Sequence, residues 1–118
     1  MTATDMIELL SRYRIMGLAE SVVQNQIEHA LRMEGVAYAR EVELAPGDRI
    51  DFMVGTVGIE VKIKGTRAQI IRQLARYARN DCTKEIILAS TSRRILASIP
   101  SEITDVPIAK HLLQGGLL

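Results

Sequence analysis

The segment Asp48–Lys64 contains two short stretches that constrain the fold more than any other part of the chain. In each stretch apolar and polar residues alternate, and Gly55–Gly58 between them suits a turn. Side chains of a strand point to alternate faces, so Glu60 and Lys62 share one face of the second strand. If the two strands pair as a hairpin, Asp51 of the first comes close to Glu60. The pattern therefore predicts two carboxylates and one ammonium near one point.

The first of these strands is expected to bury its apolar residues on a single face; they are Ile50, Phe52 and Val54. Across the hairpin, Asp51 and Glu60 would repel each other and raise each other's pKa unless a cation lies between them. Hard oxygen ligands suit Mg²⁺ or Mn²⁺. A divalent cation is therefore the expected cofactor.

Asp51, followed by Glu60-Val61-Lys62 on the next strand, resembles the Asp…Glu-x-Lys core of the PD-(D/E)XK nuclease superfamily. The chain lacks the proline that often precedes the aspartate in that motif. The resemblance covers about residues 20–89 and implies a restriction-endonuclease-like core. That core is an α/β fold, with a central mixed β-sheet flanked by helices, in one domain over residues 1–118.

The resemblance also implies roles for individual residues. The implied metal ligands are Glu20, Asp51, Glu60 and the main-chain carbonyl of Val61. Glu20 enters this set because a helix before the core strands carries a glutamate in the superfamily, and Glu28 is the alternative. Glu20 would position a second metal or the water, and Asp51 and Glu60 would be catalytic through the metal they bind. Lys62 would orient or help deprotonate the attacking water.

A second motif follows the lysine. Gln73-Leu-Ala-Arg-Tyr77 resembles the Gln-x-x-x-Tyr motif of the RecB-type branch of the same superfamily. There the two residues help to orient the metal site and the DNA strand. The resemblance makes Gln73 a candidate catalytic residue and Tyr77 a candidate DNA contact. The alternative is structural, with Gln73 on the surface and Tyr77 a half-buried anchor.

Positive charge is concentrated in residues 62–94, which contain nine lysines and arginines against two acids, although the net charge of the chain is +1. A basic region beside an acidic cluster suits a protein that grips phosphates and holds a divalent metal. The alternative is a plain solvated helix face. Candidate contacts to the DNA backbone are Lys64, Arg67, Arg72 and Arg76.

Periodicity places the remaining elements. Helices are predicted at residues 4–13, 18–34, 66–79 and 92–98, and strands at residues 36–44, 49–54, 59–64, 85–89 and 103–109. Thr4 is expected to cap the first helix, and Thr66 with Gln69 has the spacing of a capping box. The apolar run at 85–89 is expected to lie parallel to the Glu60 strand. The last strand is expected at an edge of the sheet, followed by a weakly specified tail.

These features predict a small Mg²⁺-dependent deoxyribonuclease that is structure- or end-directed rather than sequence-specific. The chain resembles small phage or bacterial members of the superfamily, and its short length is similar to that of Holliday-junction resolvases and compact VRR-type nucleases. The Gln-x-x-x-Tyr motif instead favours end-processing nucleases. A homodimer with two active sites would explain cutting of both strands of DNA. The alternative is a non-catalytic nucleic-acid-binding or assembly subunit that keeps the fold.

The composition predicts a cytoplasmic protein without a membrane segment. No apolar run approaches the length of a membrane span, and the first residues lack the pattern of a signal peptide. The single Cys82 cannot form an internal disulfide.

Overall fold

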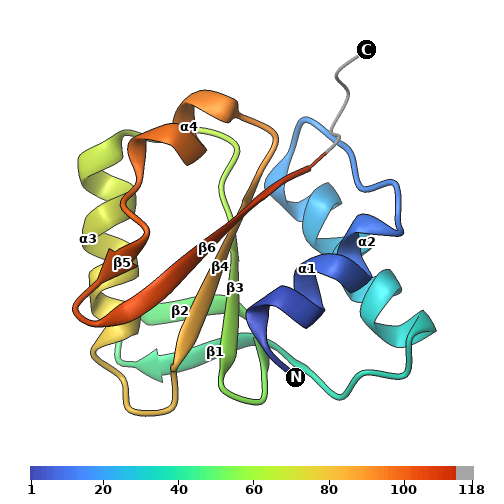
Figure 1. The fold of residues 1–118 in the computed structure, drawn as a ribbon, viewed down its shortest axis with the longest axis horizontal. Helices are drawn as coiled ribbons and strands as arrows, with labels where there is room; N and C mark the ends of the chain where they lie inside the picture. The colour runs from blue at the N-terminus through green and yellow to red at the C-terminus, as the bar shows by residue number, and fades with distance from the viewer. Residues whose placement is uncertain (114–118) are drawn as a thin grey trace.

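The computed structural model describes residues 1–113, which form a six-stranded mixed sheet with helices on both faces (Figure 1). The helices are α1 (Ala3–Ser11), α2 (Glu20–Met33), α3 (Arg67–Ala78) and α4 (Arg93–Ser98). The strands are β1 (Ala39–Ala45), β2 (Asp48–Val54), β3 (Val57–Val61), β4 (Glu85–Ser90), β5 (Glu102–Ile103) and β6 (Val106–Leu112). The prediction of an α/β fold with a mixed sheet flanked by helices is confirmed.

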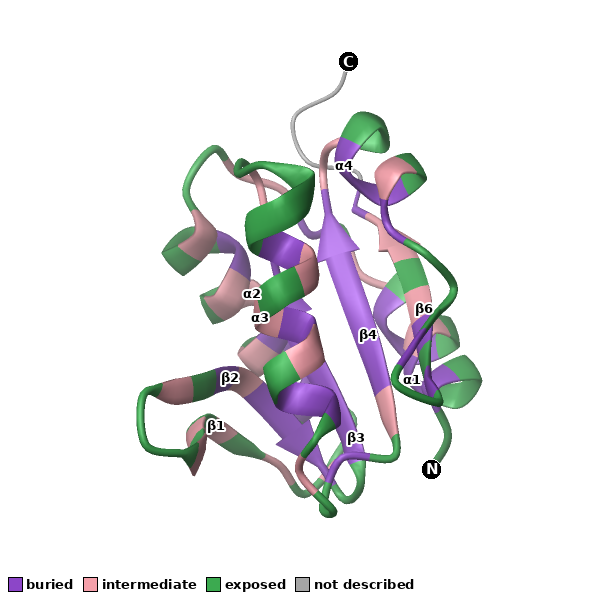
Figure 2. Ribbon diagram, turned by 90° about the vertical axis from the view of Figure 1, so that its left-hand side faces the viewer, coloured by how far each residue is buried: buried purple, intermediate pink, exposed green. Residues whose placement is uncertain are grey.

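The strand order is β1-β2-β3-β4-β6-β5. β1, β2 and β3 form an antiparallel meander, whereas β4 lies parallel to both β3 and β6. The buried strand β4 runs through the middle of the molecule (Figure 2). Its parallel pairing with β3 is the one predicted from its place after a strand and a helix, and its burial is the one predicted from its continuous apolar run.

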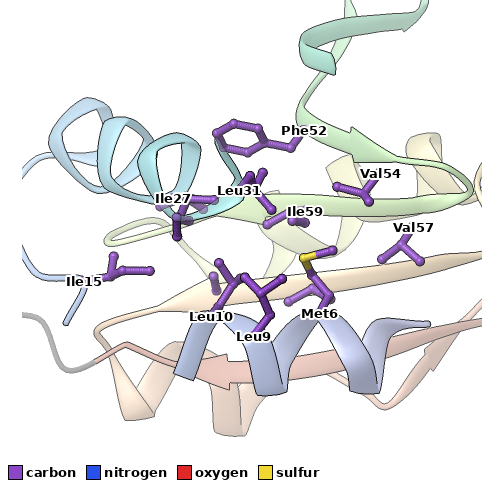
Figure 3. Packing of buried hydrophobic residues seen from close by; sticks show 14 of the residues in the cluster. Met6, Leu9, Leu10, Ile15, Ile27, Leu31, Phe52, Val54, Val57 and Ile59 are labelled. Carbon is purple, nitrogen blue, oxygen red and sulfur yellow. The ribbon is translucent and has the colours of Figure 1, made fainter. Parts of the chain in front are cut away.

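Each face of the sheet has its own hydrophobic cluster. α1 and α2 cover one face, and Figure 3 shows Met6 and Leu10 of α1 and Ile27 of α2 packed with Phe52 and Ile59 of the sheet. α3 and α4 cover the other face, and their cluster includes residues of β2, β4 and β6. Aliphatic side chains dominate both clusters, as expected of a chain with one Phe and no Trp.

Local hydrogen bonds explain where two helices begin. Thr66 caps α3 in the predicted box, since its hydroxyl accepts from the Gln69 N–H and the Gln69 side chain accepts from the Thr66 N–H, both at 3.2 Å. α1 is capped by Thr2 instead of the predicted Thr4. Thr2 has Asp5 three residues later, and the two exchange hydrogen bonds of 3.0 and 3.1 Å. No helix in residues 1–113 has the length and apolar character needed to cross a membrane.

The two edges of the sheet are β1 and the two-residue strand β5. Alternate residues of β1 are exposed, and Glu41 in its middle has a positive φ of 54°. The single strand predicted at 103–109 is divided in the structure: Ile103 ends the edge strand β5, whereas residues 106–109 begin β6, which lies between β4 and β5. Thr104 and Asp105, with φ of 52° and 66°, allow a tight hairpin that supplies β5 as the edge. Of the predicted tail, residues 110–112 belong to β6, and 114–118 lie outside the described residues.

Candidate active site

β2 and β3 separate at Asp51 and Glu60. Main-chain pairing between the two strands ends at Phe52 and Ile59. Beyond that pair, the Val61 N–H donates to Asp51 Oδ2 at 2.7 Å, and the Asp51 N–H donates to Glu60 Oε1 at 3.2 Å. Two side-chain carboxylates thus accept main-chain hydrogen bonds in the gap between the strands. We call Asp51 and Glu60 in this gap the carboxylate fork.

The fork coincides with a change of face in β2. Phe52 and Val54 pack in the α1 and α2 cluster, but Ile50 packs in the α3 and α4 cluster with Met53. Ile50 fills the space beside Gly58, where a Cβ atom would collide with Ile50 Cδ1. The prediction that Ile50, Phe52 and Val54 share one face is therefore wrong for Ile50. A glycine on the neighbouring strand leaves room there for the larger side chain.

The fork holds its negative charge at a cost in free energy. Burial raises the pKa of Glu60 to about 7, and the charge of Asp51 adds to this effect. Burial also raises the pKa of Asp51, while its hydrogen bond from the Val61 N–H opposes the shift. The Lys62 ammonium lies 3.0 Å from Glu60 Oε2 and stabilises both carboxylates in their charged forms. The one positive charge of Lys62 therefore offsets the two negative charges of Asp51 and Glu60 only in part.

The first residue of α2 reaches the same end of the sheet. Glu20 Oε2 accepts a hydrogen bond of 3.1 Å from the Ile63 N–H, just beyond the end of β3. Its charge contributes to the raised pKa of Asp51. Glu28, the alternative candidate, instead accepts hydrogen bonds from Arg40 Nη1 at 2.9 Å and Tyr38 Oη at 2.7 Å. Of the two glutamates, Glu20 is therefore the one placed to act with the fork.

Gln24 is a site residue that the sequence analysis missed. Its side chain lowers the pKa of the Asp51 carboxyl, and its Oε1 accepts from Arg40 Nη2 at 3.4 Å. The four-residue spacing of Glu20, Gln24 and Glu28 was the available signal, because it places all three on one side of α2. At about 1.5 Å per residue, this row spans about 12 Å, so only its first members can reach the fork.

The Gln-x-x-x-Tyr pair lies on α3, and its two members lie in different environments. Gln73 is half-buried and lines a pocket beside the fork. Tyr77 has 0% exposure, and its hydroxyl donates to the main-chain oxygen of Arg49 at 2.7 Å. Burial, with the charges of Glu60 and Asp51, raises the pKa of Tyr77, so its hydroxyl stays neutral. The predicted contact of Tyr77 with DNA is wrong, because this side chain anchors β2 from inside the core.

Two adjoining pockets open beside the fork. The first, of about 270 Å³, is lined by Glu20, Lys62, Lys64, Gly65, Gln69, Ile70 and Gln73. The second, of about 320 Å³, is lined by Leu18, Ala19, Glu20, Ile63 and Lys64. Because the pockets share Glu20 and Lys64, we treat them as one depression and call it the fork groove. Lys62 connects the groove to the fork, since it lines the first pocket and contacts Glu60.

The four predicted DNA-backbone contacts are all exposed. Lys64 lines both pockets of the groove. Arg67 begins α3, and Arg72 and Arg76 follow on the same helix, four residues apart. Arg76 is partly engaged, because its Nε donates to Asp48 Oδ1 at 2.8 Å. The exposed side of α3 is visible in Figure 2.

The metal ligands predicted from the sequence do not form a closed cage. Within residues 1–113, no three His, Cys, Asp or Glu side chains are grouped in a way that could hold a metal ion. Mg²⁺, however, usually keeps several waters and uses only one or two protein carboxylates. Asp51 and Glu60 supply that number, and Glu20 adds a third carboxylate nearby, with Lys62 and Lys64 as the neighbouring ammonium groups. This donor chemistry fits a hard divalent cation.

Comparison with known proteins adds no relative. No family model, no curated protein and no solved structure matches the chain. The carboxylate fork and its groove are therefore the features from which a function can be inferred.

Proposed function

We propose that this protein is a metal-dependent deoxyribonuclease with a restriction-endonuclease-like core. The observation that carries the proposal is the carboxylate fork, with Lys62 Nζ 3.0 Å from Glu60 at the border of a groove. Perturbed pKa values beside a cleft are common at catalytic sites. A purely structural role is a weaker explanation, because a buried and a half-buried carboxylate side by side, both with raised pKa values, reduce stability at neutral pH.

The fork and Glu20 would hold Mg²⁺ or Mn²⁺, with the Val61 carbonyl as a further ligand. When bound, a divalent cation supplies Lewis-acid stabilisation of phosphate charge and lowers the pKa of water. Asp51 is held for this role by its hydrogen bond of 2.7 Å from the Val61 N–H. Carboxylates that already accept main-chain hydrogen bonds lose little further conformational freedom on binding a ligand.

The remaining chemistry falls to residues at the border of the groove. Lys62, with 18% of its side chain exposed, would orient the attacking water, help to remove its proton and steady the phosphate oxygens. Gln73 lines the same pocket and would orient the water or the phosphate through its amide. Lys64 and the arginines of α3 would bind neighbouring phosphates of the strand. Contacts of this kind position DNA without reading its sequence, which supports structure- or end-directed cutting.

We also propose that two copies act together when both strands are cut. Each chain contributes one fork, and one fork hydrolyses one phosphodiester bond at a time. A homodimer in which one copy carries an inactive fork would nick duplex DNA without breaking it. Analytical ultracentrifugation with and without DNA measures the association directly.

The test of the proposed function is cleavage of plasmid, linear duplex, single-stranded and four-way-junction DNA in Mg²⁺, Mn²⁺ or EDTA. Lys62→Ala should lower the cleavage rate by about 100-fold or more, the usual scale for loss of a proton-transfer group. Lys84→Ala is the matched control, because it removes an exposed lysine next to the β2–β3 turn, at the opposite end of β3 from Lys62. It should cut at the wild-type rate.

Two results would contradict the nuclease. One is cutting in EDTA that Lys62→Ala leaves unchanged, which would indicate a contaminating enzyme. The other is a wild-type protein that binds DNA in EDTA and cuts none of the substrates with either metal. That second result would assign the chain to the alternative class, a nucleic-acid-binding or assembly subunit with a nuclease-like fold.

A further inference from the structure

Arg40 is a half-buried cation on the strand next to the fork. In β1 it is the main-chain partner of Phe52, the residue that follows Asp51. Only 24% of its side chain is exposed, and its alternate neighbours along the strand, Tyr38 and Val42, are also half-buried. Burying a guanidinium costs free energy unless its N–H groups find acceptors. The acceptors that Arg40 uses therefore indicate its role.

Three acceptors of Arg40 belong to α2. Its Nη1 donates to Asn25 Oδ1 at 2.8 Å and to Glu28 Oε1 at 2.9 Å, and its Nη2 donates to Gln24 Oε1 at 3.4 Å. The guanidinium also lies over the ring of Phe52, with 5.7 Å between its central carbon and the ring centroid. One planar group thus joins three side chains of the helix to the pair of strands β1 and β2. The single ammonium of a lysine does not reproduce this planar array of donors.

The start of α2 depends on tertiary contacts of this kind. Ala19 occupies the N-cap position, and its side chain offers no hydrogen bond to the first turn. The first N–H groups of a helix lack main-chain partners, so an end without a cap is weakly held. Glu20 ties the first turn to the Ile63 N–H, and Arg40 ties the second turn to β1 through Gln24. Arg40 therefore helps to fix the part of α2 that lies beside the fork.

We propose that Arg40 is a positioning residue of the candidate active site, which acts through Gln24 to hold the Asp51 carboxylate for a divalent cation. The inference rests on the proposed function and adds a residue to that site. Because Gln24 Oε1 accepts from Arg40, the amide nitrogen of Gln24 is left to face the carboxylate. Partners that orient a metal ligand in this way contribute to metal affinity without touching the metal.

The electrostatic effect of Gln24 has the sign that this orientation requires. Burial raises the pKa of Asp51, whereas the side chain of Gln24 lowers it. A hydrogen-bond donor next to a carboxyl lowers its pKa, and an amide oxygen turned toward it has the opposite effect. The contact of Gln24 Oε1 with Arg40 and the influence of Gln24 on Asp51 therefore indicate the same orientation of the amide.

The first test measures metal affinity without cleavage. Mn²⁺ is titrated calorimetrically at pH 8 into the wild type, Arg40→Met, Gln24→Ala and the double variant. Arg40→Met keeps an unbranched stem over Phe52 and should weaken Mn²⁺ binding by about tenfold, as expected when a partner of a metal ligand is lost. Gln24→Ala should have a similar effect, and the double variant should bind no more weakly than either single variant. Losses that add in the double variant would contradict an action of Arg40 through Gln24.

A matched control separates positioning from stability. Asn25→Ala removes a different acceptor of Arg40 and leaves Gln24 in place, so it should bind Mn²⁺ with wild-type affinity. Urea unfolding gives the stability of every variant. If Mn²⁺ affinity follows the free energy of unfolding and falls in Asn25→Ala as well, the role of Arg40 is structural only and the proposal is wrong.

The second test uses cleavage. The Mg²⁺ concentration that gives the half-maximal rate should rise about tenfold in Arg40→Met and keep its wild-type value in Asn25→Ala, and excess Mg²⁺ should recover most of the lost rate. An unchanged Mg²⁺ requirement in Arg40→Met would overturn the proposal even if the protein is an active nuclease.

The third test needs neither metal nor DNA. The side-chain amide of Gln24 is followed by ¹⁵N NMR, and its protons should exchange with water faster in Arg40→Met than in the wild type, because the amide loses its partner. Equal exchange in the two proteins would overturn the positioning role. A wild type that binds no Mn²⁺ would reject the metal site and the nuclease, whatever the amide of Gln24 does.

Discussion

Glu60 is the acid of the candidate site whose pKa is raised into the neutral range. In the unfolded chain a glutamate titrates near 4.5, whereas burial and the charge of Asp51 raise the pKa of Glu60 to about 7. Between these two values the folded protein binds more protons than the unfolded chain. The free energy of unfolding therefore falls as pH rises from about 4.5 to 7 and is constant above that range with respect to this group.

Replacement of Glu60 by glutamine should remove this contribution. A pKa difference of this size corresponds to about 3 kcal/mol of stability lost across the interval, so Glu60→Gln should be correspondingly less sensitive to pH there than the wild type. Urea unfolding of both proteins at several pH values from 4.5 to 8 measures the difference. Glu43→Gln, at an exposed position of β1, is the control and should keep the wild-type dependence. Identical pH dependence in wild type and Glu60→Gln would show that Glu60 titrates normally.

At the scale of elements, the fork depends on how β2 packs against β3. The Ile50 side chain packs on the α3 face of the sheet because Gly58 leaves space there. The two neighbours of Asp51 in the chain, Ile50 and Phe52, therefore pack in opposite hydrophobic clusters. Tyr77 of α3 fixes the same part of β2, because its hydroxyl donates to the main-chain oxygen of Arg49. The geometry of the site is therefore set by one glycine, one isoleucine and one tyrosine in the packed interior.

Gly58→Ala should destabilise the fold by about 1 to 3 kcal/mol, because the new methyl group collides with Ile50 Cδ1 in a packed interior. Ile50→Val removes that Cδ1 atom and alone should cost about 1 kcal/mol. The double variant should lose clearly less stability than the two single losses added together, because each change relieves the other. Urea unfolding of the four proteins measures the coupling. Strict additivity would mean that Ile50 does not occupy the space beside Gly58.

The sequence predicts elements well where the signal is local. The capping box of α3 follows from sequence spacing, and the burial of β4 follows from its uninterrupted apolar stretch; both are confirmed. The face change at Ile50 and the burial of Tyr77 could not be predicted, because they depend on which residue lies across the sheet or beneath it. The place of β6 inside the sheet likewise depends on a two-residue hairpin partner with little periodicity of its own.

In the candidate site, too, local signals were predictable and tertiary packing was not. The proximity of Asp51, Glu60 and Lys62 was predictable, because a tight hairpin fixes which residues lie opposite each other. Sequence spacing equally favoured Glu20, Gln24 and Glu28 as partners from α2. The choice among them depends on how the helix docks on the sheet, and that docking is a tertiary property.

For the whole molecule, binding of a divalent cation at the fork should be coupled to folding. At about ten times its dissociation constant, Mg²⁺ should raise the free energy of unfolding by about 1.4 kcal/mol. The effect should be present at pH 8 and lost at pH 5, where Glu60 is protonated in the folded protein. Thermal unfolding with Mg²⁺ or EDTA at both pH values measures it. Asp51→Asn should abolish the stabilisation, and Mg²⁺ stabilisation that persists in this variant would locate the bound ion elsewhere.

The two edge strands of the sheet, β1 and β5, determine whether the sheets of two copies can pair. β1 presents Glu41 and Glu43 outward, with a positive φ at Glu41 that interrupts a regular strand, and β5 offers only two residues to a partner. The like charges on β1 and the short length of β5 oppose pairing of a further strand with the sheet edges, which is the route by which sheets grow into fibrils. Concentrated protein should therefore remain free of amyloid-like aggregates.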